Sequence, residues 1–165
     1  MNDVINILVV DDHPLFRQGV VNSLEMDPGF KVVAQADSGE EALALAQKLL
    51  PDLVLLDIGM RGWSGILSAE KIATACPATV IVMLTGSDDK DKLLAALKAG
   101  ARAYVLKGVS AKELAAIVRS AVAGDVYVSP SIAAEMLVSL TRGRAPDPLQ
   151  ELTDREREID RKSVV

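Results

Sequence analysis

The stretch that decides the fold is "ILVVDDHP", residues 7–14, in which a short apolar run is followed at once by two acids and a proline. The run Ile5–Val10 has the length of a strand and is mostly apolar, as expected of a strand covered on both faces of a parallel sheet. Pro14 stands where the first turn of a helix accepts proline. The stretch therefore predicts a strand, a short loop that carries Asp11 and Asp12, and then a helix.

The same alternation of strand and helix continues along the chain. Ser38 and Ser110 each precede a glutamate by three residues, as in capping boxes that start helices. Gly100 and Gly124 follow helical patterns, as glycines at helix ends do. This order predicts an open, doubly wound α/β sheet. The further strand-sized apolar runs are 31–36, 53–56, 79–84 and 103–106.

Composition limits the class of protein. The 165 residues are 50% apolar but only 3% aromatic, which suits one aliphatic domain with an appendage. A single cysteine, Cys76, excludes an internal disulfide and fits a reducing compartment. We find no signal peptide and no apolar run long enough to span a membrane, so we expect a cytoplasmic protein. The net charge of −5 argues against nucleic-acid binding by this chain.

Chemically useful side chains follow the predicted strands. In an open α/β sheet, ligands bind beyond the carboxyl ends of the strands, where Asp11, Asp12, Asp57, Thr85 and Lys107 stand. Three neighbouring carboxylates resist ionising together, and a hard cation such as Mg²⁺ removes that cost. A carboxylate can also attack phosphorus, and a lysine and a hydroxyl can then contact the phosphate oxygens. The pattern predicts phosphoryl transfer onto an aspartate.

Each of these residues also has an ordinary interpretation. Asp11 could cap the helix that starts near Pro14, and Asp57 could be a turn residue. Lys107 could be a surface lysine, and Thr85 could lie in a loop without a role. Their occurrence at equivalent strand ends favours a shared site over four separate coincidences.

Several segments resemble the receiver domain of two-component response regulators. The resemblance implies a flavodoxin-like fold of five strand–helix units with strand order 2-1-3-4-5, followed by a C-terminal linker helix. Two of its segments, "DDHPLFR" and the later "LTDRERE", resemble the subfamily that carries a LuxR-type helix-turn-helix domain. The receiver segments are "ILVVDDHPLFRQGV" (7–20), "PDLVLLDIGM" (51–60), "VIVMLTGSDD" (80–89) and "ALKAGARAYVLKGVS" (96–110).

The resemblance assigns the residues of the phosphorylation site. Asp57 is implied to be the phosphoacceptor, which takes phosphate from the phosphohistidine of a sensor histidine kinase. Asp12, Asp57 and the carbonyl of Gly59 are implied to ligate Mg²⁺, while Asp11 holds the water shell of the metal. Lys107 is implied to pair with the phosphate.

The resemblance also implies a switch and two partners. Thr85 would move to bond the phosphoryl oxygen, and Tyr104 would swing inward with it; without the resemblance, Tyr104 would be a half-buried strand residue. The charge of an added phosphate suits such a bistable element. The kinase is expected to dock at the first helix, on a face with Leu15, Phe16 and Val20. Phosphorylation is expected to favour a homodimer.

The chain is expected to divide into three parts. Residues 1–124 form the receiver, and residues 125–150 form a Pro- and Gly-rich linker with a helix at about 131–141. Residues 151–165, with "LTDREREIDRKSVV" at 152–165, start a LuxR-type domain but leave no room for a recognition helix. We therefore expect no DNA binding from this chain, and DNA binding with control of transcription from a full-length protein.

One departure from the family pattern lies beside the predicted site. Arg61 stands where the family usually has proline, and Trp63 lies two residues further along the chain. These residues either belong to an ordinary exposed loop or tune the choice of partner or the lifetime of the phosphate. His13, the only histidine, is interpreted as structural.

Three other functions compete with the receiver interpretation. A Mg²⁺-dependent aspartyl-phosphate phosphotransferase commonly has a second acid two residues after its nucleophile, where this chain has Gly59. A phosphorylation-independent interaction module would leave the acid site without use. A flavodoxin-like nucleotide-binding protein would need a phosphate cradle that the first loop lacks. We therefore expect a signalling switch rather than an enzyme in the ordinary sense.

Overall fold

The computed structural model describes residues 4–86 and 89–144. Six parallel strands form one sheet in the order β2-β1-β3-β4-β5-β6. The strands are β1 (Ile5–Val10), β2 (Phe30–Ala36), β3 (Leu53–Asp57), β4 (Val80–Thr85), β5 (Ala103–Leu106) and β6 (Tyr127–Val128). The helices are α1 (Pro14–Glu25), α2 (Gly39–Leu49), α3 (Gly65–Ala75), α4 (Lys90–Lys98), α5 (Ala111–Val122) and α6 (Pro130–Arg144).

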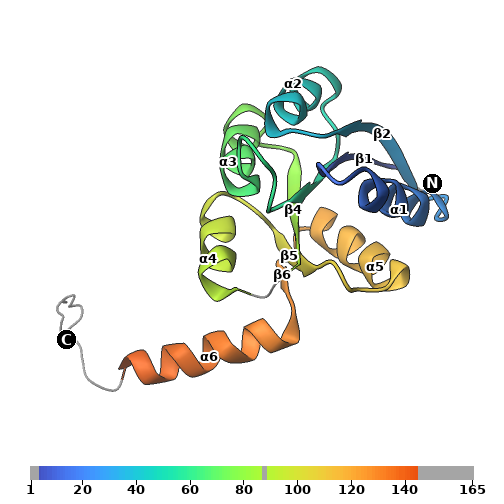
Figure 1. Cartoon of the computed structure of the whole chain (residues 1–165). Helices are drawn as coiled ribbons and strands as arrows, with labels where there is room; N and C mark the ends of the chain where they lie inside the picture. The colour runs from blue at the N-terminus through green and yellow to red at the C-terminus, as the bar shows by residue number, and fades with distance from the viewer. Residues whose placement is uncertain (1–3, 87–88, 145–165) are drawn as a thin grey trace. The chain divides into compact units, whose positions relative to one another are not determined.

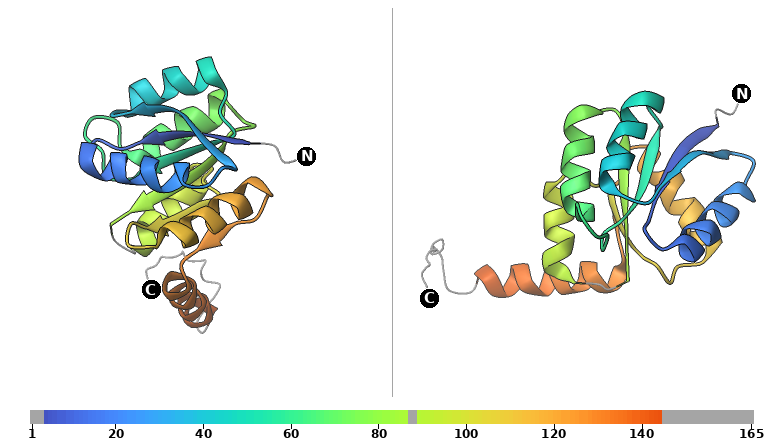
Figure 2. Two further views of the ribbon diagram at one scale, coloured as in Figure 1. Left: turned by 90° about the vertical axis from the view of Figure 1, so that its right-hand side faces the viewer. Right: turned by 45° about the horizontal axis from the view of Figure 1, so that its top comes forward.

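Helices cover both faces of the sheet, which confirms the predicted doubly wound α/β fold. Figures 1 and 2 show α1 and α5 on one side of the sheet and α2, α3 and α4 on the other. Every residue of the central strand β3 is buried, as its apolar pattern predicts. The core between the sheet and α1 and α5 is mainly aliphatic and includes Ile7, Val9, Leu24, Leu53, Val82 and Val118.

The helix starts follow the capping signals only in part. Ser110 and Glu113 form the complete predicted capping box of α5. At α2 the Ser38 side chain accepts a hydrogen bond from the backbone N–H of Glu41. The Glu41 carboxylate, however, accepts from the backbone N–H of Asp37, so only half of that predicted box forms.

The sheet has one more strand than the sequence predicted. The segment after Gly124 forms β6, where Tyr127 pairs with Ala103 and Val128 pairs with Tyr104. The added strand covers the backbone groups that β5 would otherwise expose at the edge of the sheet. A strand of two residues is too short to show any period in the sequence, and only its pairing reveals it. The predicted order 2-1-3-4-5 is correct for the first five strands.

The chain divides between Ser129 and Pro130, and α6 begins the second unit. The predicted helix at about 131–141 is present, but it begins one residue earlier and extends to Arg144. Residues 145–150 of the predicted linker and the predicted LuxR-type segment, 151–165, lie outside the described residues. Within the described part of the chain, no helix is long and apolar enough to cross a membrane.

Candidate functional site

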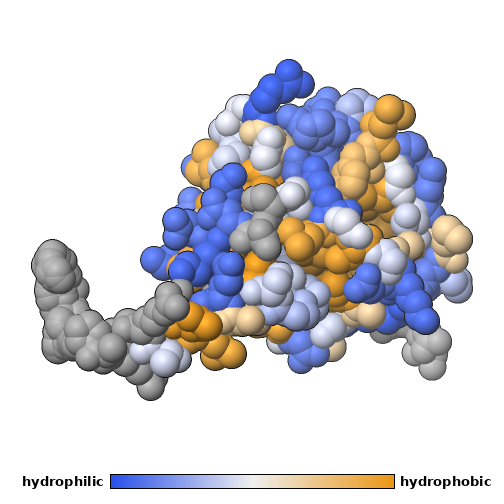
Figure 3. Space-filling view, turned by 60° about the horizontal axis from the view of Figure 1, so that its bottom comes forward, coloured by the Kyte–Doolittle hydropathy of each residue, from blue (hydrophilic) through white to orange (hydrophobic). Residues whose placement is uncertain are grey.

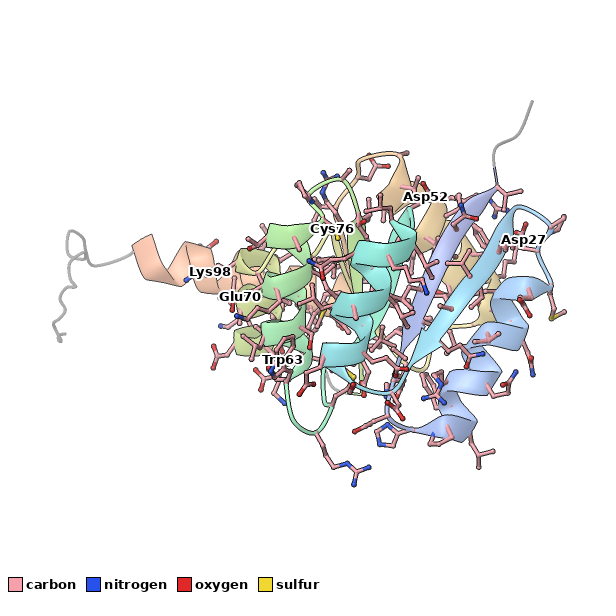
Figure 4. The ribbon with its side chains drawn as sticks, turned by 90° about the horizontal axis from the view of Figure 1, so that it is seen from above. Asp27, Asp52, Trp63, Glu70, Cys76 and Lys98 are labelled. Carbon is pink, nitrogen blue, oxygen red and sulfur yellow. The ribbon has the colours of Figure 1, made fainter. Side chains whose placement is uncertain are left out.

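The candidate site lies at the carboxyl ends of β1, β3, β4 and β5. Two labelled residues in Figure 4 mark the two ends of the sheet. Asp52, just before β3, lies at the amino end, and Trp63, in the loop after β3, lies at the opposite, carboxyl end. Asp57 is the last residue of β3, and Thr85 is the last residue of β4. The parallel register brings these ends together because Asp57 pairs with Leu84, next to Thr85.

Two of the predicted acids and the predicted lysine are in direct contact. Lys107 Nζ lies 3.1 Å from Asp57 Oδ1 and 3.3 Å from Asp11 Oδ2. Both carboxylates are buried, with 3% of each side chain exposed. The backbone N–H of Lys107 also donates to the carbonyl of Thr85 at 2.8 Å. The ammonium of Lys107 therefore offsets part of the negative charge of two buried carboxylates, Asp11 and Asp57, which are far apart in the sequence.

The charge on Asp57 is unfavourable in this setting. Burial is the main cause that raises the pKa of Asp57, and the negative charge of Asp11 raises it further. The hydrogen bond from Lys107 lowers the pKa but does not cancel the rise. Asp57 Oδ2 is buried and has no hydrogen-bond partner among the residues that the structure describes. A buried carboxylate oxygen without a partner is costly. A cation or an electrophile at this oxygen would remove that cost.

Asp12 completes the acid cluster from the side of the solvent. The backbone N–H of Arg61 donates to Asp12 Oδ2 at 3.1 Å, and Arg61 Nε lies 3.5 Å from the same oxygen. Burial raises the pKa of Asp12, but the Arg61 N–H and the charges of His13 and Arg61 outweigh burial and lower it. Asp12 Oδ1 is buried without a hydrogen-bond partner within 4–86 and 89–144. Asp12 is thus ionised, with one oxygen held and the other directed into the protein.

His13 belongs to this cluster, which the sequence did not indicate. Its Nδ1 lies 2.8 Å from Asp11 Oδ1, 3.2 Å from Asp12 Oδ1 and 3.8 Å from Asp57 Oδ2. One ligand atom from each of these four residues lies within 4.8 Å of the others, so together they could hold a metal ion. The interpretation of His13 as only structural did not include these contacts. The one available signal was its place directly after Asp11 and Asp12.

Asp11 does not cap helix α1, so that alternative interpretation is wrong. The residue at the N-cap is His13, and it makes no side-chain capping hydrogen bond. Asp11 Oδ1 instead accepts from the backbone N–H of His13, outside the helix. Asp11 Oδ2 pairs with Lys107, so the carboxylate of Asp11 is directed at the cluster.

Helix α3 holds the loop that follows Asp57. The helix begins at Gly65, whose N–H donates to the carbonyl of Ile58 at 3.1 Å. A Cβ atom on Gly65 would overlap the backbone of Asp57 and Ile58. Glycine therefore allows the start of α3 to lie directly against the backbone of the candidate phosphoacceptor.

Gly59 contacts the cluster through its backbone, whereas the Tyr104 hydroxyl is bonded to the residue that starts α4. The Tyr104 side chain is fully buried, rather than half-buried as a plain strand residue would be, and its hydroxyl donates to the carbonyl of Asp89 at 3.5 Å. Asp89 is the N-cap of α4, so Tyr104 links β5 to the start of that helix. The N–H of Gly59 donates weakly to Asp57 Oδ1 at 3.4 Å, which fixes the turn after β3.

The fold and this site together define a class of protein: an α/β domain with an acid cluster, a lysine and a hydroxyl residue at the carboxyl edge of its sheet. The model of the response regulator receiver domain family matches residues 7–119. The chain belongs to this family, whose general function is switching by phosphorylation in two-component systems.

Individual relatives agree with the family match. The chain is 36% identical over 157 residues to the response regulator GacA of Pseudomonas aeruginosa, covering 94% of this chain and 73% of GacA. It is 36% identical to the nitrate/nitrite response regulator protein NarL of Escherichia coli K12, covering 93% of this chain and 72% of NarL. It is similar also to LiaR of Bacillus subtilis, a transcriptional regulatory protein, at 35% identity over 94% of this chain and 74% of LiaR.

Solved structures give the same result. A two-component response regulator of the LuxR family from Aurantimonas superposes with a TM-score of 0.80 at 33% identity, covering 84% of this chain and 99% of that one. The receiver domain of the response regulator NarL from Mycobacterium tuberculosis superposes with a TM-score of 0.71 at 34% identity, covering 74% of this chain and 98% of that one.

Proposed function

We propose that this receiver accepts a phosphoryl group on Asp57 from the phosphohistidine of a sensor histidine kinase. The observation that supports this most directly is the state of the two carboxylate oxygens. Oδ1 is paired with Lys107 at 3.1 Å, while Oδ2 is buried and has no hydrogen-bond partner in the described residues. The arrangement keeps a cation beside one oxygen and leaves the other without a hydrogen-bond partner, as suits a carboxylate that binds a metal ion and reacts with phosphorus.

The residues present fit a Mg²⁺ ion. The donors are carboxylate oxygens, which hard cations prefer, and two of them, Asp12 Oδ1 and Asp57 Oδ2, are buried without hydrogen-bond partners in the described chain. In our proposal Asp12, Asp57 and the carbonyl of Gly59 hold the ion, and Asp11 holds its water shell. When bound, the ion neutralises the carboxylates and the phosphate oxygens.

The protein residues then have simple roles in the transfer. A carboxylate oxygen of Asp57 forms a bond to phosphorus as the bond from phosphorus to the histidine nitrogen breaks, and the kinase histidine keeps the electron pair. Lys107 offsets negative charge on the phosphoryl oxygens, and the buried site limits access of water to the acyl phosphate. Water later hydrolyses the acyl phosphate, and this hydrolysis returns Asp57 to the free carboxylate and resets the switch. In this proposal the domain assists its own phosphorylation and is not an enzyme in the ordinary sense.

Thr85 and Tyr104 carry the switch in this proposal. Thr85 ends β4 and is buried, and its carbonyl is bound by the backbone of Lys107. An added phosphate brings about 1.5 to 2 negative charges, which draws the Thr85 hydroxyl toward it. Tyr104 is buried on β5, which pairs with β4, and its hydroxyl donates to the carbonyl of Asp89, so in this proposal movement of Thr85 is transmitted to the start of α4.

The kinase is proposed to dock on the groove between α1 and the start of α5. This groove has a volume of about 280 Å³ and includes the predicted docking residues Leu15, Phe16 and Val20, with Lys107 at its edge. Leu15 is 91% exposed, so its apolar side chain is accessible to a partner. Hydrophobic residues gather in the middle of the face that Figure 3 shows, with hydrophilic residues around them.

The groove also positions the lysine. Lys107 Nζ lies 4.5 Å from the centre of the Phe16 ring, a cation–π contact that holds the ammonium toward Asp11 and Asp57. A partner that covers Phe16 would therefore act beside the reacting carboxylate. In a full-length protein we propose that the phosphorylated receiver dimerises and controls DNA binding and transcription in the cytoplasm.

The test of the proposed function uses acetyl phosphate as a small phosphodonor. The protein is incubated with Mg²⁺ and the donor, and intact mass and oligomeric state are measured for wild type and Asp57→Ala. We expect a gain of one phosphate in wild type only, together with a shift toward dimer. Absence of the mass gain in wild type, or an equal gain in Asp57→Ala, would contradict Asp57 as the acceptor.

A further inference from the structure

We infer that the guanidinium of Arg61 is a tethered cation that competes with Mg²⁺ for Asp12, so that the charge at position 61 sets the Mg²⁺ concentration at which this receiver is loaded. The inference rests on the proposed metal site. It concerns a residue at the place where the family pattern has proline, and proline could supply neither the charge nor a backbone donor.

Arg61 makes two separate contacts with Asp12. Its backbone N–H donates to Oδ2 at 3.1 Å, and its Nε lies 3.5 Å from the same oxygen. The backbone contact fixes the orientation of the carboxylate, so that Oδ1 is the oxygen left buried and without a hydrogen-bond partner in the described chain. Any residue except proline provides that backbone contact, whereas the second contact depends on the side chain.

The two side chains differ sharply in exposure. The Arg61 side chain is 91% exposed, while that of Asp12 is only 11% exposed. The guanidinium therefore approaches the acid cluster from the solvent and can leave it without disturbing the core. Such a group pairs with the carboxylate when the cluster lacks a metal and withdraws when a stronger cation arrives.

The charges around the cluster give the direction of the effect. Three carboxylates, Asp11, Asp12 and Asp57, face the ammonium of Lys107, the guanidinium of Arg61 and the ring of His13. Removing the guanidinium makes the cluster more negative by one charge and frees Asp12 Oδ2 from its side-chain partner. Both changes favour a divalent cation, so a neutral residue at position 61 should tighten Mg²⁺ binding.

The experiment measures Mg²⁺ binding by titration calorimetry on the whole chain, with no phosphodonor present. Arg61→Gln keeps the backbone N–H and removes only the charge, whereas Arg61→Pro would remove both and confuse the two effects. Arg61→Lys keeps the charge. Arg102→Gln is the matched control, because it removes an exposed positive charge just before β5, at the amino ends of the strands.

We expect Arg61→Gln to bind Mg²⁺ about three- to tenfold more tightly than wild type, from the repulsion of one exposed charge and a divalent ion screened by salt. Arg61→Lys should bind more like wild type than like Arg61→Gln, and Arg102→Gln should match wild type. The difference in Mg²⁺ affinity between wild type and Arg61→Gln should become smaller at high NaCl concentration. Equal affinities for wild type and Arg61→Gln would overturn the inference and leave the metal site intact. No saturable binding by any variant would overturn the metal site and the inference with it.

Discussion

At the scale of single residues, the buried environment of Asp57 suits its proposed reaction but lowers the stability of the fold. Burial and the neighbouring Asp11 raise its pKa above the ordinary 3.8, which means that the folded protein binds this proton more tightly than the unfolded chain does. The destabilisation that results from ionising Asp57 is absent at pH values below its ordinary pKa. It is complete at pH values above the raised pKa of the folded protein. Ionised Asp57 therefore destabilises the fold at neutral pH.

Asp57→Asn should accordingly stabilise the metal-free protein at pH 7 by about 1 to 2 kcal/mol, the usual scale for a buried polar group without a partner. The gain should shrink as the pH falls through the raised pKa toward 3.8. Urea unfolding of both proteins between pH 4 and 8, with a chelator present, measures this difference. A gain that does not change with pH, or a loss at pH 7, would contradict the assignment of a raised pKa.

Some contacts of the site could be predicted from the sequence and others could not. The meeting of Asp11, Asp57 and Lys107 was predictable because each follows a strand, and parallel strands bring their carboxyl ends to one edge. The contacts of His13 and Arg61 were not predictable, because both residues lie in or beside loops. Their positions depend on side-chain rotamers that no spacing in the sequence encodes.

At the scale of helices and strands, the junction between β3 and α3 is the tightest part of the site. The start of α3 lies so close to the backbone of Asp57 and Ile58 that a Cβ atom at Gly65 would overlap both. We expect Gly65→Ala to destabilise the protein by about 1 to 3 kcal/mol, as overpacking does, and to slow phosphorylation because the loop after Asp57 must move.

Gly19→Ala is the matched control for this prediction. Gly19 lies within α1, and a Cβ atom there would meet nothing within 4 Å. Alanine is favoured over glycine in a helix interior, so this variant should be stabilised by about 0.5 to 1 kcal/mol. Thermal unfolding and the rate of mass gain with acetyl phosphate measure both variants. Equal behaviour of the two would show that the space around Gly65 is not restrictive.

The elements themselves were predictable to different degrees. Strands β1 to β5 were evident because helices cover both faces of the sheet, which selects continuous apolar runs such as Leu53–Leu56. Strand β6 was missed as a strand because its two residues, Tyr127 and Val128, are defined only by pairing with β5. The full burial of Tyr104 was not predicted, because β5 lies between two strands only through β6, and periodicity could not have shown the bond to Asp89.

At the scale of the whole molecule, the acid cluster makes the stability of the sheet depend on the binding of a metal ion. The cluster joins the ends of β1, β3 and β5, and its three carboxylates repel one another, opposed by Lys107, Arg61 and His13. Any ion that binds the folded cluster and not the unfolded chain must stabilise the whole domain. Asp12 Oδ1 and Asp57 Oδ2, which lack hydrogen-bond partners among the described residues, mark where that stabilisation would originate.

We therefore expect Mg²⁺ to raise the free energy of unfolding, by about 2.7 kcal/mol at a concentration one hundred times its dissociation constant. Chelator should reverse the effect. NaCl at matched ionic strength separates metal binding from general screening, because screening weakens the repulsion among carboxylates without a specific site. Asp12→Asn removes a proposed ligand and should lose most of the response to Mg²⁺. If NaCl stabilises wild type as strongly as Mg²⁺ does, or if Asp12→Asn responds like wild type, the cluster acts as a set of repelling charges and not as a metal site.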